Sequence, residues 1–201
     1  MPERVIIIGA GGHGKVIADI VIKSGDTLVG FLDDNVKGER VLGFPILGDI
    51  ACSSGYKDSA VFVVGIGDNR TRKRITEDHD LNWHTAIHPS AQIGMDVHIG
   101  KGTVIMANAV VNTGAWIGNG VIINTVAVVE HDCVIGDYAH ISPGAVLCGG
   151  VKIEECVWIG AGVQIKNGLT ICSEAIIGTG AAVISNITDK GTYTGIPAKR
   201  G

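Results

Sequence analysis

The chain has 201 residues, of which 46% are hydrophobic, 18% are charged and 4% are aromatic. This composition is too apolar for a disordered chain, and the 30 glycines with only five prolines follow no collagen period. The formal net charge of −4, with basic residues dispersed along the chain, argues against a nucleic-acid partner.

The N-terminal part of the chain predicts a small α/β domain. Buried strands are expected at residues 5–8, 28–32 and 61–64, where apolar and β-branched residues run almost continuously. Helices are expected at residues 16–23 and 71–78. Strands that alternate with helices favour a parallel sheet, and this unit has the size of half a Rossmann fold.

A glycine-rich loop joins the first strand to the first helix. Gly9, Gly11 and Gly14 satisfy the spacing GxGxxG, and Asp33 stands 19 residues beyond Gly14, where a ribose-binding acid belongs. A complete dinucleotide fold would repeat this half, so a nicotinamide dehydrogenase is a weak alternative. Half a unit suits a mononucleotide, with the diphosphate of a nucleotide sugar at the helix N-terminus. A purely structural turn is the other interpretation.

From residue 87 onward, large aliphatic residues recur at every sixth position. Four positions after each of them stands a mostly small residue, and glycine often follows the aliphatic directly. A fixed period of this kind indicates stacked rungs, and three six-residue rungs close one triangular coil. We expect a parallel β-helix of five to six coils over residues 81–201, after an α/β domain over residues 1–80. The aliphatic positions are Ile87, Ile93, Ile99, Ile105, Val111, Ile117, Ile123, Val129, Ile135, Ile141, Leu147, Ile153, Ile159, Ile165, Ile171, Ile177 and Val183.

The cysteines and the longest uncharged stretch indicate a cytoplasmic protein without a membrane span. Five cysteines are an odd number, show no CxxC spacing and follow no apolar leader. Cys133 falls in the small inward column, so we expect a core residue rather than a nucleophile. Residues 102–129 carry no charge, but asparagines and threonines interrupt them too often for a spanning helix. No histidine or cysteine cluster has metal-binding spacing.

The triplet Glu130-His131-Asp132 is the strongest candidate for a catalytic site. His131 follows the inward Val129 by two positions, at a turn, and its acidic neighbours would raise its basicity. Histidine suits the removal of a proton from an amine that attacks a thioester at neutral pH. One coil above His131 stands Gly149, whose bare N–H is a candidate oxyanion donor. A solvated polar turn is the alternative interpretation of the triplet.

The whole chain resembles a family of hexapeptide-repeat sugar acyltransferases with a left-handed parallel β-helix. These enzymes N-acetylate UDP-linked 4-amino-4,6-dideoxy sugars in bacillosamine-type pathways, and sialic acid O-acetyltransferases are their relatives. The resemblance rests on residues 9–14, residues 31–34, residues 66–70, Asn124-Thr125, Glu130-His131-Asp132, His140 with Ser142, and residues 195–199.

The resemblance implies acetyl-CoA as cosubstrate, no metal, a homotrimer, and His131 as the general base. It implies that Asp132 hydrogen-bonds His131, and it includes Glu130, Asn124 and His140 among the catalytic candidates. His131 and His140 are half a coil apart, so we expect them to serve one site from different subunits. The remaining candidates are Gly149, Lys199 and Arg200 for acetyl-CoA, and Gly11, Gly12, His13, Gly14, Asp33, Asp34, Gly67, Asn69 and Arg70 for the nucleotide sugar.

We therefore expect an acetyl-CoA-dependent N-acetyltransferase that acts by direct transfer on the 4-amino group of a UDP-linked 4-amino-4,6-dideoxy sugar. O-acetylation of a sialic acid or another hydroxyl acceptor is the alternative in the same fold. A non-enzymatic nucleotide-binding scaffold is the alternative from a different class. The sequence does not identify the nucleotide base, the sugar stereochemistry or the pathway.

Overall fold

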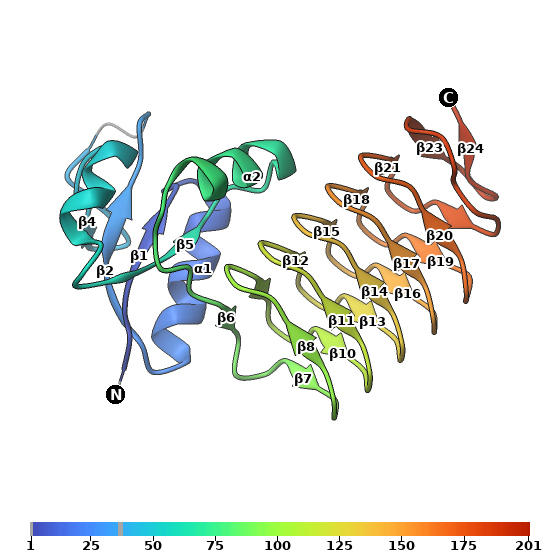
Figure 1. Cartoon of the computed structure of the whole chain (residues 1–201), viewed down its shortest axis with the longest axis horizontal. Helices are drawn as coiled ribbons and strands as arrows, with labels where there is room; N and C mark the ends of the chain where they lie inside the picture. Colours follow the sequence, from blue (N-terminus) through green and yellow to red (C-terminus); the bar gives the residue numbers. More distant parts are fainter. Residues whose placement is uncertain (1, 36–37) are drawn as a thin grey trace.

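The computed structural model of the protein describes residues 2–35 and 38–201 and contains an α/β unit followed by a solenoid (Figure 1). In the α/β unit, three parallel strands pair in the order β2-β1-β5. No helix in the described residues has the length and apolar character needed to cross a bilayer. The elements of this unit are β1 (Arg4–Ile8), α1 (Gly12–Lys23), β2 (Thr27–Leu32), β3 (Arg40–Val41), β4 (Phe44–Pro45), η1 (Ile50–Tyr56), β5 (Val61–Val64) and α2 (Asn69–Asp78).

The three strands and the two helices expected in this unit are present. Helix α1 begins at Gly12 rather than at Val16, because the second half of the glycine loop forms its first turn. Helix α2 begins at Asn69 because the Asp68 carboxylate accepts a hydrogen bond from the backbone N–H of Thr71 at 2.8 Å. The β3–β4 hairpin and the short helix η1 were not expected. The predicted boundary between residues 80 and 81 falls between α2 and β6.

The solenoid is a parallel β-helix of two-residue strands. Across residues 86–183, which the structure describes without a gap, strands β6 to β22 follow one another at six-residue intervals. Each strand pairs with the equivalent strands of the neighbouring coils, as Val128 does with Val110 and Val146. This confirms the six-residue rung and the coil of three rungs. The strands are β6 (Ala86–Ile87), β7 (Gln92–Ile93), β8 (His98–Ile99), β9 (Val104–Ile105), β10 (Val110–Val111), β11 (Trp116–Ile117), β12 (Ile122–Ile123), β13 (Val128–Val129), β14 (Val134–Ile135), β15 (His140–Ile141), β16 (Val146–Leu147), β17 (Lys152–Ile153), β18 (Trp158–Ile159), β19 (Gln164–Ile165), β20 (Thr170–Ile171), β21 (Ile176–Ile177), β22 (Ala182–Val183), β23 (Thr192–Thr194) and β24 (Lys199–Arg200).

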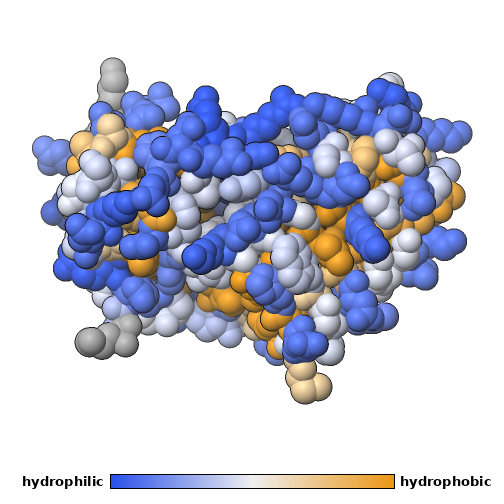
Figure 2. Space-filling model, viewed as in Figure 1, coloured by the Kyte–Doolittle hydropathy of each residue, from blue (hydrophilic) through white to orange (hydrophobic). Residues whose placement is uncertain are grey.

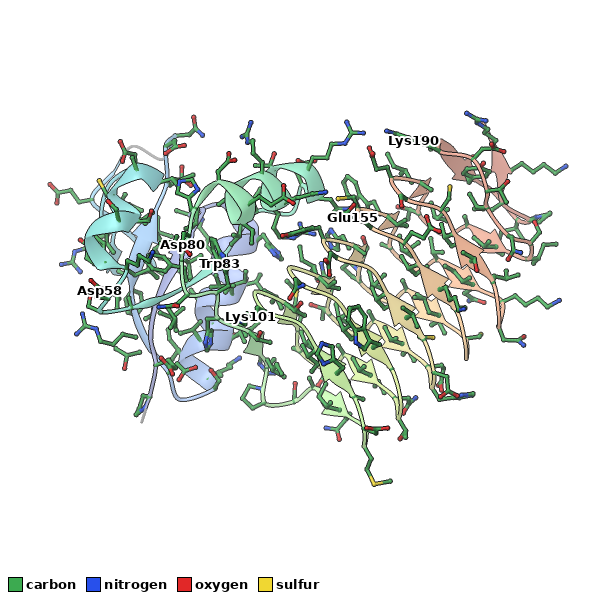
Figure 3. The ribbon with its side chains drawn as sticks, in the orientation of Figure 1. Asp58, Asp80, Trp83, Lys101, Glu155 and Lys190 are labelled. Carbon is green, nitrogen blue, oxygen red and sulfur yellow. The ribbon has the colours of Figure 1, made fainter. Side chains whose placement is uncertain are left out.

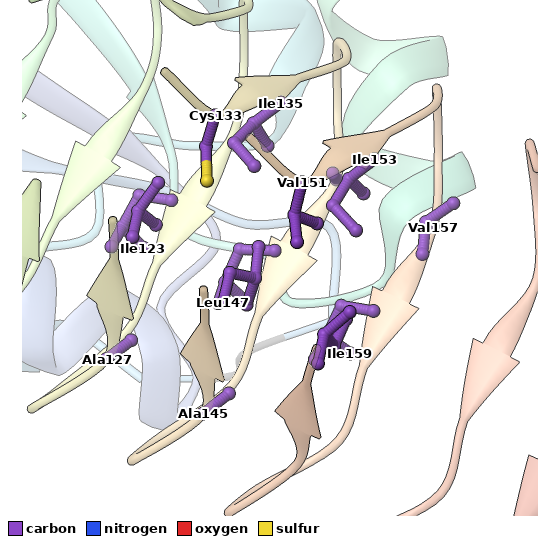
Figure 4. Close-up of a cluster of buried hydrophobic side chains, with 14 of the residues drawn as sticks. Ile123, Ala127, Cys133, Ile135, Ala145, Leu147, Val151, Ile153, Val157 and Ile159 are labelled. Carbon is purple, nitrogen blue, oxygen red and sulfur yellow. The ribbon is translucent and has the colours of Figure 1, made fainter. Parts of the chain in front are cut away.

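The aliphatic ladder forms the core of the β-helix (Figure 4). Ile123 and Leu147 from the large column and Ala145 from the small column are fully buried. Cys133 is fully buried in this ladder, so it is a core residue, as expected, and burial raises the pKa of its thiol to about 11. Ile93 departs from the expectation with 38% exposure, because β7 is the outermost strand of its sheet and no coil lies beyond it.

One flank of the β-helix leaves apolar side chains exposed. Figure 2 shows hydrophobic residues gathered over the middle of the visible solenoid face, bordered by polar ones. Trp116 on β11 is 43% exposed and stacks on His98, with 5.0 Å between ring centroids. Val134, the next residue of this outward column, is 39% exposed. This flank therefore exposes large apolar side chains to solvent in a continuous outward column.

The N-terminal domain covers part of another face of the β-helix. Helix α1 lies between the three-stranded sheet and the solenoid (Figure 1). Outward-facing Val104 and Ile122 are buried against Ile17 and its neighbours on this helix. The next residue of the same outward column is His140, which pairs with Ile122 across the β12–β15 ladder. The packing of α1 against this outward column therefore ends beside His140.

Each corner of the β-helix contains a residue in the left-handed backbone conformation. From residue 96 to residue 180, every sixth residue has a positive φ. Glycine, asparagine and aspartate adopt this conformation with little strain, but Val126 is β-branched and has a φ of 58°. A Cβ on Gly100, which precedes such a corner, would lie 2.5 Å from the backbone of Gly118 on the next coil. This confirms that close backbone approach explains glycines after the aliphatic ladder.

The strain at Val126 gives a stability prediction. Val126→Asn should raise the free energy of unfolding by about 1 kcal/mol, because asparagine tolerates the left-handed conformation better than valine. Asn108 occupies the same corner one coil earlier with a φ of 56°, so Asn108→Val should lower stability by a similar amount. Equilibrium denaturation of both variants checks this pair. Changes of the same sign in both would contradict the assignment of strain.

Candidate active site

His131 lies at the corner between β13 and β14, with 64% of its side chain exposed. Its Nδ1 is 2.8 Å from Oδ2 of Asp132. Because an ionised carboxylate only accepts hydrogen bonds, Nδ1 carries the proton and Nε2 is the free basic nitrogen. Asp132 has a φ of 59°, a conformation that aspartate tolerates. The predicted contact is therefore direct, although aspartate is one methylene shorter than glutamate.

The two neighbouring carboxylates make His131 a stronger base. The hydrogen bond to Asp132 raises the pKa of His131 above its ordinary value, and the negative charges of Asp132 and Glu130 act in the same direction. Desolvation acts in the opposite direction and is second in size to the hydrogen bond. The site therefore combines an exposed imidazole, a fixed tautomer and increased proton affinity, which are the properties of a general base.

Gly149 lies directly above the imidazole of His131. The backbone N–H of Gly150 donates to the His131 carbonyl at 2.9 Å, which stacks the two corners. A Cβ on residue 149 would lie 2.5 Å from Nε2 of His131, so the ring occupies its place only because this residue is glycine. The structure thus puts Gly149 where the coil repeat predicts it. Its part as an oxyanion donor stays a prediction.

A second histidine site lies between the two domains. His140 is 8% exposed, and its ring centroid is 6.5 Å from that of His13 at the start of α1. Asn124 Nδ2 donates to Nε2 of His140 at 3.0 Å. Trp158, one coil above, stacks on His140 with 5.9 Å between ring centroids. The structure therefore brings Asn124, His13 and His140 together within one chain, on a different sheet from His131.

Both histidines at this interface are neutral at physiological pH. Burial lowers the pKa of His140 to about 3 and the pKa of His13 to about 4, and the positive charge of Arg72 acts in the same direction on both. Nε2 of His13 is buried without a hydrogen-bond partner among the described residues. Buried polar atoms are rarely left unpaired, so this cleft suits a polar ligand atom.

A groove continues from His140 along β15, β18 and β21. Its volume is about 400 Å³, and its lining includes Ser142, Trp158 and Ile176. The Trp158 indole N–H donates to Ser142 Oγ at 3.0 Å, which fixes the ring as one wall. Sequence reasoning did not single out Trp158, although it stands exactly one coil after His140 in the same outward column.

The glycine loop leaves the N-terminus of α1 open. A Cβ on Gly14 would lie 1.9 Å from the Gly9 carbonyl oxygen, so the tight turn requires glycine there. A Cβ on Gly11 or Gly12 would meet nothing within 4 Å, and no side chain caps the helix. Free backbone N–H groups at a helix N-terminus favour an anion such as a phosphate.

The two aspartates after β2 bind different segments of the N-terminal domain. Asp33 Oδ2 accepts from the backbone N–H of Ala10 at 2.7 Å, and Asp34 Oδ1 accepts from that of Ile50 at 2.9 Å. Both aspartates line a cavity of about 160 Å³ together with Arg74. Asp33 therefore orders the glycine loop, and its contact with a ribose stays a prediction.

Gly67, Asn69 and Arg70 lie where the N-terminal domain meets the β-helix. The Asn69 side-chain amide donates to the carbonyls of residues 156–157 at 3.0 and 3.1 Å. Arg70 forms an ion pair with Glu174 on a distant coil. The structure thus gives Asn69 and Arg70 a part in joining the domains that the sequence did not indicate. Their contact with the substrate, and that of Gly67, stays a prediction.

Lys199 and Arg200 form β24 at the end of the β-helix far from the N-terminal domain (Figure 1). Both are exposed, and Arg200 donates to the carbonyl of Lys190 at 2.9 Å. Their contact with acetyl-CoA stays a prediction. Within the described residues, no group of three or more histidine, cysteine, aspartate or glutamate side chains could hold a metal ion.

Two family models match this chain, one in the N-terminal α/β domain and one in the β-helix. The PglD N-terminal domain family matches residues 4–79, and the family of bacterial transferase hexapeptide (six repeats) matches residues 114–149. The solved structure of the acetyltransferase domain of PglB from Neisseria gonorrhoeae FA1090, in complex with acetyl coenzyme A, is 38% identical to this chain, with a TM-score of 0.95. The match covers 100% of both chains. The chain belongs to the hexapeptide-repeat sugar acetyltransferases. Its fold is the expected α/β domain followed by a left-handed parallel β-helix.

Two relatives are named for different nucleotide sugars. UDP-N-acetylbacillosamine N-acetyltransferase from Bacillus subtilis (strain 168) is 39% identical over 113 residues, 52% of this chain and 52% of that protein. GDP-perosamine N-acetyltransferase from Escherichia coli O157:H7 is 33% identical over 141 residues, 66% of this chain and 64% of that protein. The chain thus spans between half and two thirds of the length of these relatives.

The pKa of His131 gives a prediction for the pH dependence of a sugar acetyltransferase. With His131 as the expected base, only its unprotonated imidazole takes the proton, so we predict that kcat/KM falls as the pH drops through the pKa of His131. Asp132→Asn removes the charge and the carboxylate bond that raise this pKa, so the acid limb should move to lower pH. The rate at the plateau should fall about 10²-fold, because the base is weaker and its tautomer is no longer fixed.

The measurement is kcat/KM for acetyl transfer from about pH 5 to pH 9. Asp96→Asn is the matched control, because Asp96 has the same left-handed corner conformation two coils earlier and lies far from His131 in sequence. An acid limb that stays in place or moves to higher pH in Asp132→Asn would contradict the proposed contact.

Proposed function

We propose that this protein transfers the acetyl group of acetyl-CoA to the 4-amino group of a UDP-linked 4-amino-4,6-dideoxy sugar. The observation that carries the proposal is the His131–Asp132 pair, whose free Nε2 faces the backbone of Gly149 at an exposed corner. Membership of the sugar acetyltransferase family supports the substrate class. The 39% identical relative is named for a UDP-linked sugar, which supports uridine as the nucleoside.

The residues at this corner suit a direct transfer. The amine attacks the thioester carbonyl while Nε2 of His131 takes its proton, so that the C–N bond forms as negative charge develops on the carbonyl oxygen. The Gly149 N–H is the proposed donor to that oxygen. The tetrahedral intermediate then collapses, the C–S bond breaks, and the CoA sulfur takes up the proton from His131. Cys133 is fully buried, which argues against an acyl-enzyme on this thiol.

The acceptor is proposed to bind on the N-terminal domain. The open N-terminus of α1, formed by residues 11–14, would hold the diphosphate. Asp33 and Asp34 line the cavity next to this loop, where the ribose and the base would lie. His13 projects from the same turn toward the cleft at His140, which would bring the sugar to the boundary of the two domains.

Acetyl-CoA is proposed to lie along the outside of the β-helix. The groove beside Ser142 and Trp158 is elongated along the stacking direction of the coils and is mostly apolar, which suits a pantetheine chain. Lys199 and Arg200 are the proposed partners of the CoA phosphates at the C-terminal end of the solenoid. Five free cysteines and a cytosolic cosubstrate support a cytoplasmic location.

The site is proposed to form between subunits of a homotrimer. His131 and His140 lie on different sheets of one prism, so a single chain does not bring both rings to one thioester. The exposed apolar flank at Trp116 and Val134 is a surface that association would cover. Threefold packing of three prisms creates equivalent clefts, each with His131 from one subunit and His140 from its neighbour.

An acceptor panel tests the proposed function. Purified protein with acetyl-CoA should acetylate a UDP-linked 4-amino-4,6-dideoxy sugar on nitrogen, with release of free CoA thiol and a product identified by mass spectrometry. The GDP-linked analogue should react with lower kcat/KM. Preferred acetylation of a sialic acid hydroxyl would replace the proposal by O-acetylation, and nucleotide binding without turnover of any acceptor would leave a binding scaffold.

Gly12→Val provides the control for the acceptor site in this panel. The backbone of Gly12 has room for a side chain, so the variant should fold, but valine would cover N–H groups that the diphosphate needs. Calorimetry should show lost UDP-sugar binding and intact CoA binding. Gly55→Val is the matched substitution at another open glycine, in η1, and should leave both unchanged. Lost CoA binding in Gly12→Val would mean that the two ligands are assigned to the wrong sites.

A further inference from the structure

Arg72 is a buried cation whose hydrogen-bond partners are all neutral. The residue is 1% exposed, and it forms no ion pair among the described residues. All three of its guanidinium nitrogens have acceptors. Nε donates to Gly120 O at 2.6 Å, Nη1 to the carbonyls of residues 66–67 at 3.1 Å each, and Nη2 to Tyr138 O at 2.7 Å and Asn69 Oδ1 at 3.0 Å.

These acceptors belong to the two domains and to successive coils. Gly120 and Tyr138 occupy equivalent positions on neighbouring coils, so they are stacked corners of the β-helix. Asn69, one helical turn before Arg72, adds the carbonyls of residues 156–157 on the third coil. One turn of α2 therefore binds three consecutive corners. Coils repeat about every 4.8 Å, so a shift of a fraction of a coil would leave buried donors unpaired.

Arg72 binds both the segment that packs on the loop of His13 and the corner that precedes His140. Residues 66–67 follow Gly65, whose Cβ would lie 2.7 Å from Cα of Gly14 in the loop that carries His13. Tyr138 stands just before His140, which begins the adjoining strand. If residues 66–67 moved relative to the corner at Tyr138, Arg72 would lose its hydrogen bonds to the carbonyls of one of these two segments.

Exposed ion pairs surround this buried contact but cannot replace it. Glu155 lies on the edge of the solenoid that faces α2, and its carboxylate accepts from Lys73 Nζ at 2.6 Å (Figure 3). Glu174 accepts from Arg70 and from Lys190 on the same side. Pairs of this exposure contribute little to stability, and long flexible side chains allow several geometries. The planar guanidinium of Arg72, in contrast, can reach its acceptors in only one geometry.

We propose that Arg72 is a positioning residue of the acetyl-transfer site, which holds the glycine-loop domain at one register on the β-helix so that His13 and His140 face the same ligand. The reaction named here rests on the proposed function, whereas the register itself rests on the hydrogen bonds of Arg72. A guanidinium without an ion-pair partner is costly to bury in the protein interior. If packing were the only requirement, an apolar side chain of similar volume would meet it. This cost is consistent with a requirement for geometry rather than for stability.

Arg72 also affects the charge of the ligand cleft. Its positive charge contributes to the lowered pKa of both His140 and His13, together with burial and with the effect of His13 on His140. A nucleotide sugar that enters the cleft would therefore meet two neutral imidazoles as hydrogen-bond partners. Loss of the charge should raise both pKa values.

Two substitutions test the proposal. Arg72→Lys keeps the charge and removes the fork, and it should lower kcat about 10²-fold while the KM values for both substrates change little, as for a misplaced site. Arg72→Met removes the charge as well. Lys73→Met is the matched control on the neighbouring position of α2 and should leave kcat unchanged. Thermal unfolding and mass measurement report whether each variant is folded and assembled.

Titration of the histidine rings by NMR provides a readout that does not depend on activity. In Arg72→Met the pKa values of His13 and His140 should rise above those of the wild type, and backbone N–H groups of residues 9–14 should exchange faster with solvent. If the wild type acetylates no nucleotide sugar, the proposed function fails, and the exchange of residues 9–14 still decides the positioning role. A lower melting temperature with unchanged kcat in Arg72→Lys, or unchanged exchange of residues 9–14 in Arg72→Met, would overturn it.

Discussion

Backbone hydrogen bonds between successive coils of the β-helix are the constraint on which the rest of this structure depends. The N–H of Val128 donates to the carbonyl of Ala145, and comparable bonds join every pair of neighbouring coils. Because these bonds fix the register, a residue at any corner has a known neighbour one coil above it. Gly149 is beside His131 for this reason, and Trp158 is beside His140. The β-helix thus converts a sequence interval into a spatial contact at each candidate site.

The two histidine sites differ because their surroundings move their pKa values in opposite directions. His131 is exposed and bonded to Asp132, which raises its pKa, whereas burial lowers the pKa of His140 to about 3. Environments that separate the pKa values of two titratable groups assign them different tasks. The first residue suits proton removal and the second suits a neutral hydrogen bond. The chemistry proposed here needs both, on opposite sides of a reacting acetyl group.

The sequence predicted most of what the coil repeat determines. The ladder of aliphatic residues located every strand from β6 to β22, and the coil length placed Gly149 above His131. It did not predict the exposure of Ile93, because the aliphatic pattern of the first coil is the same as that of the coils covered on both sides. The hairpin β3–β4 was missed because two-residue strands outside a repeat leave no periodic signal.

The contact between the domains could not be predicted in the same way. Asn69 and Arg72 bind backbone carbonyls, which every residue has, so no complementary side chain in the sequence reveals their partners. The motif around Asn69 was therefore assigned to the substrate, although its amide joins the domains in the structure. His13 was a candidate for the nucleotide sugar, but its proximity to His140 could not be predicted, since it exists only after the domains have docked. In contrast, Trp158 lies in a column that the repeat defines, and the interval from His140 could have identified it.

The central claim is that each acetyl-transfer site combines His131 of one subunit with His140 of its neighbour. The most direct measurement is the activity of mixed trimers reassembled from equal amounts of His131→Ala and His140→Ala chains. Each variant alone should be nearly inactive, and random mixing should restore about a quarter of the wild-type sites, because one interface in four then carries both histidines. No recovery on mixing, or full activity of His140→Ala alone, would contradict a site shared between subunits.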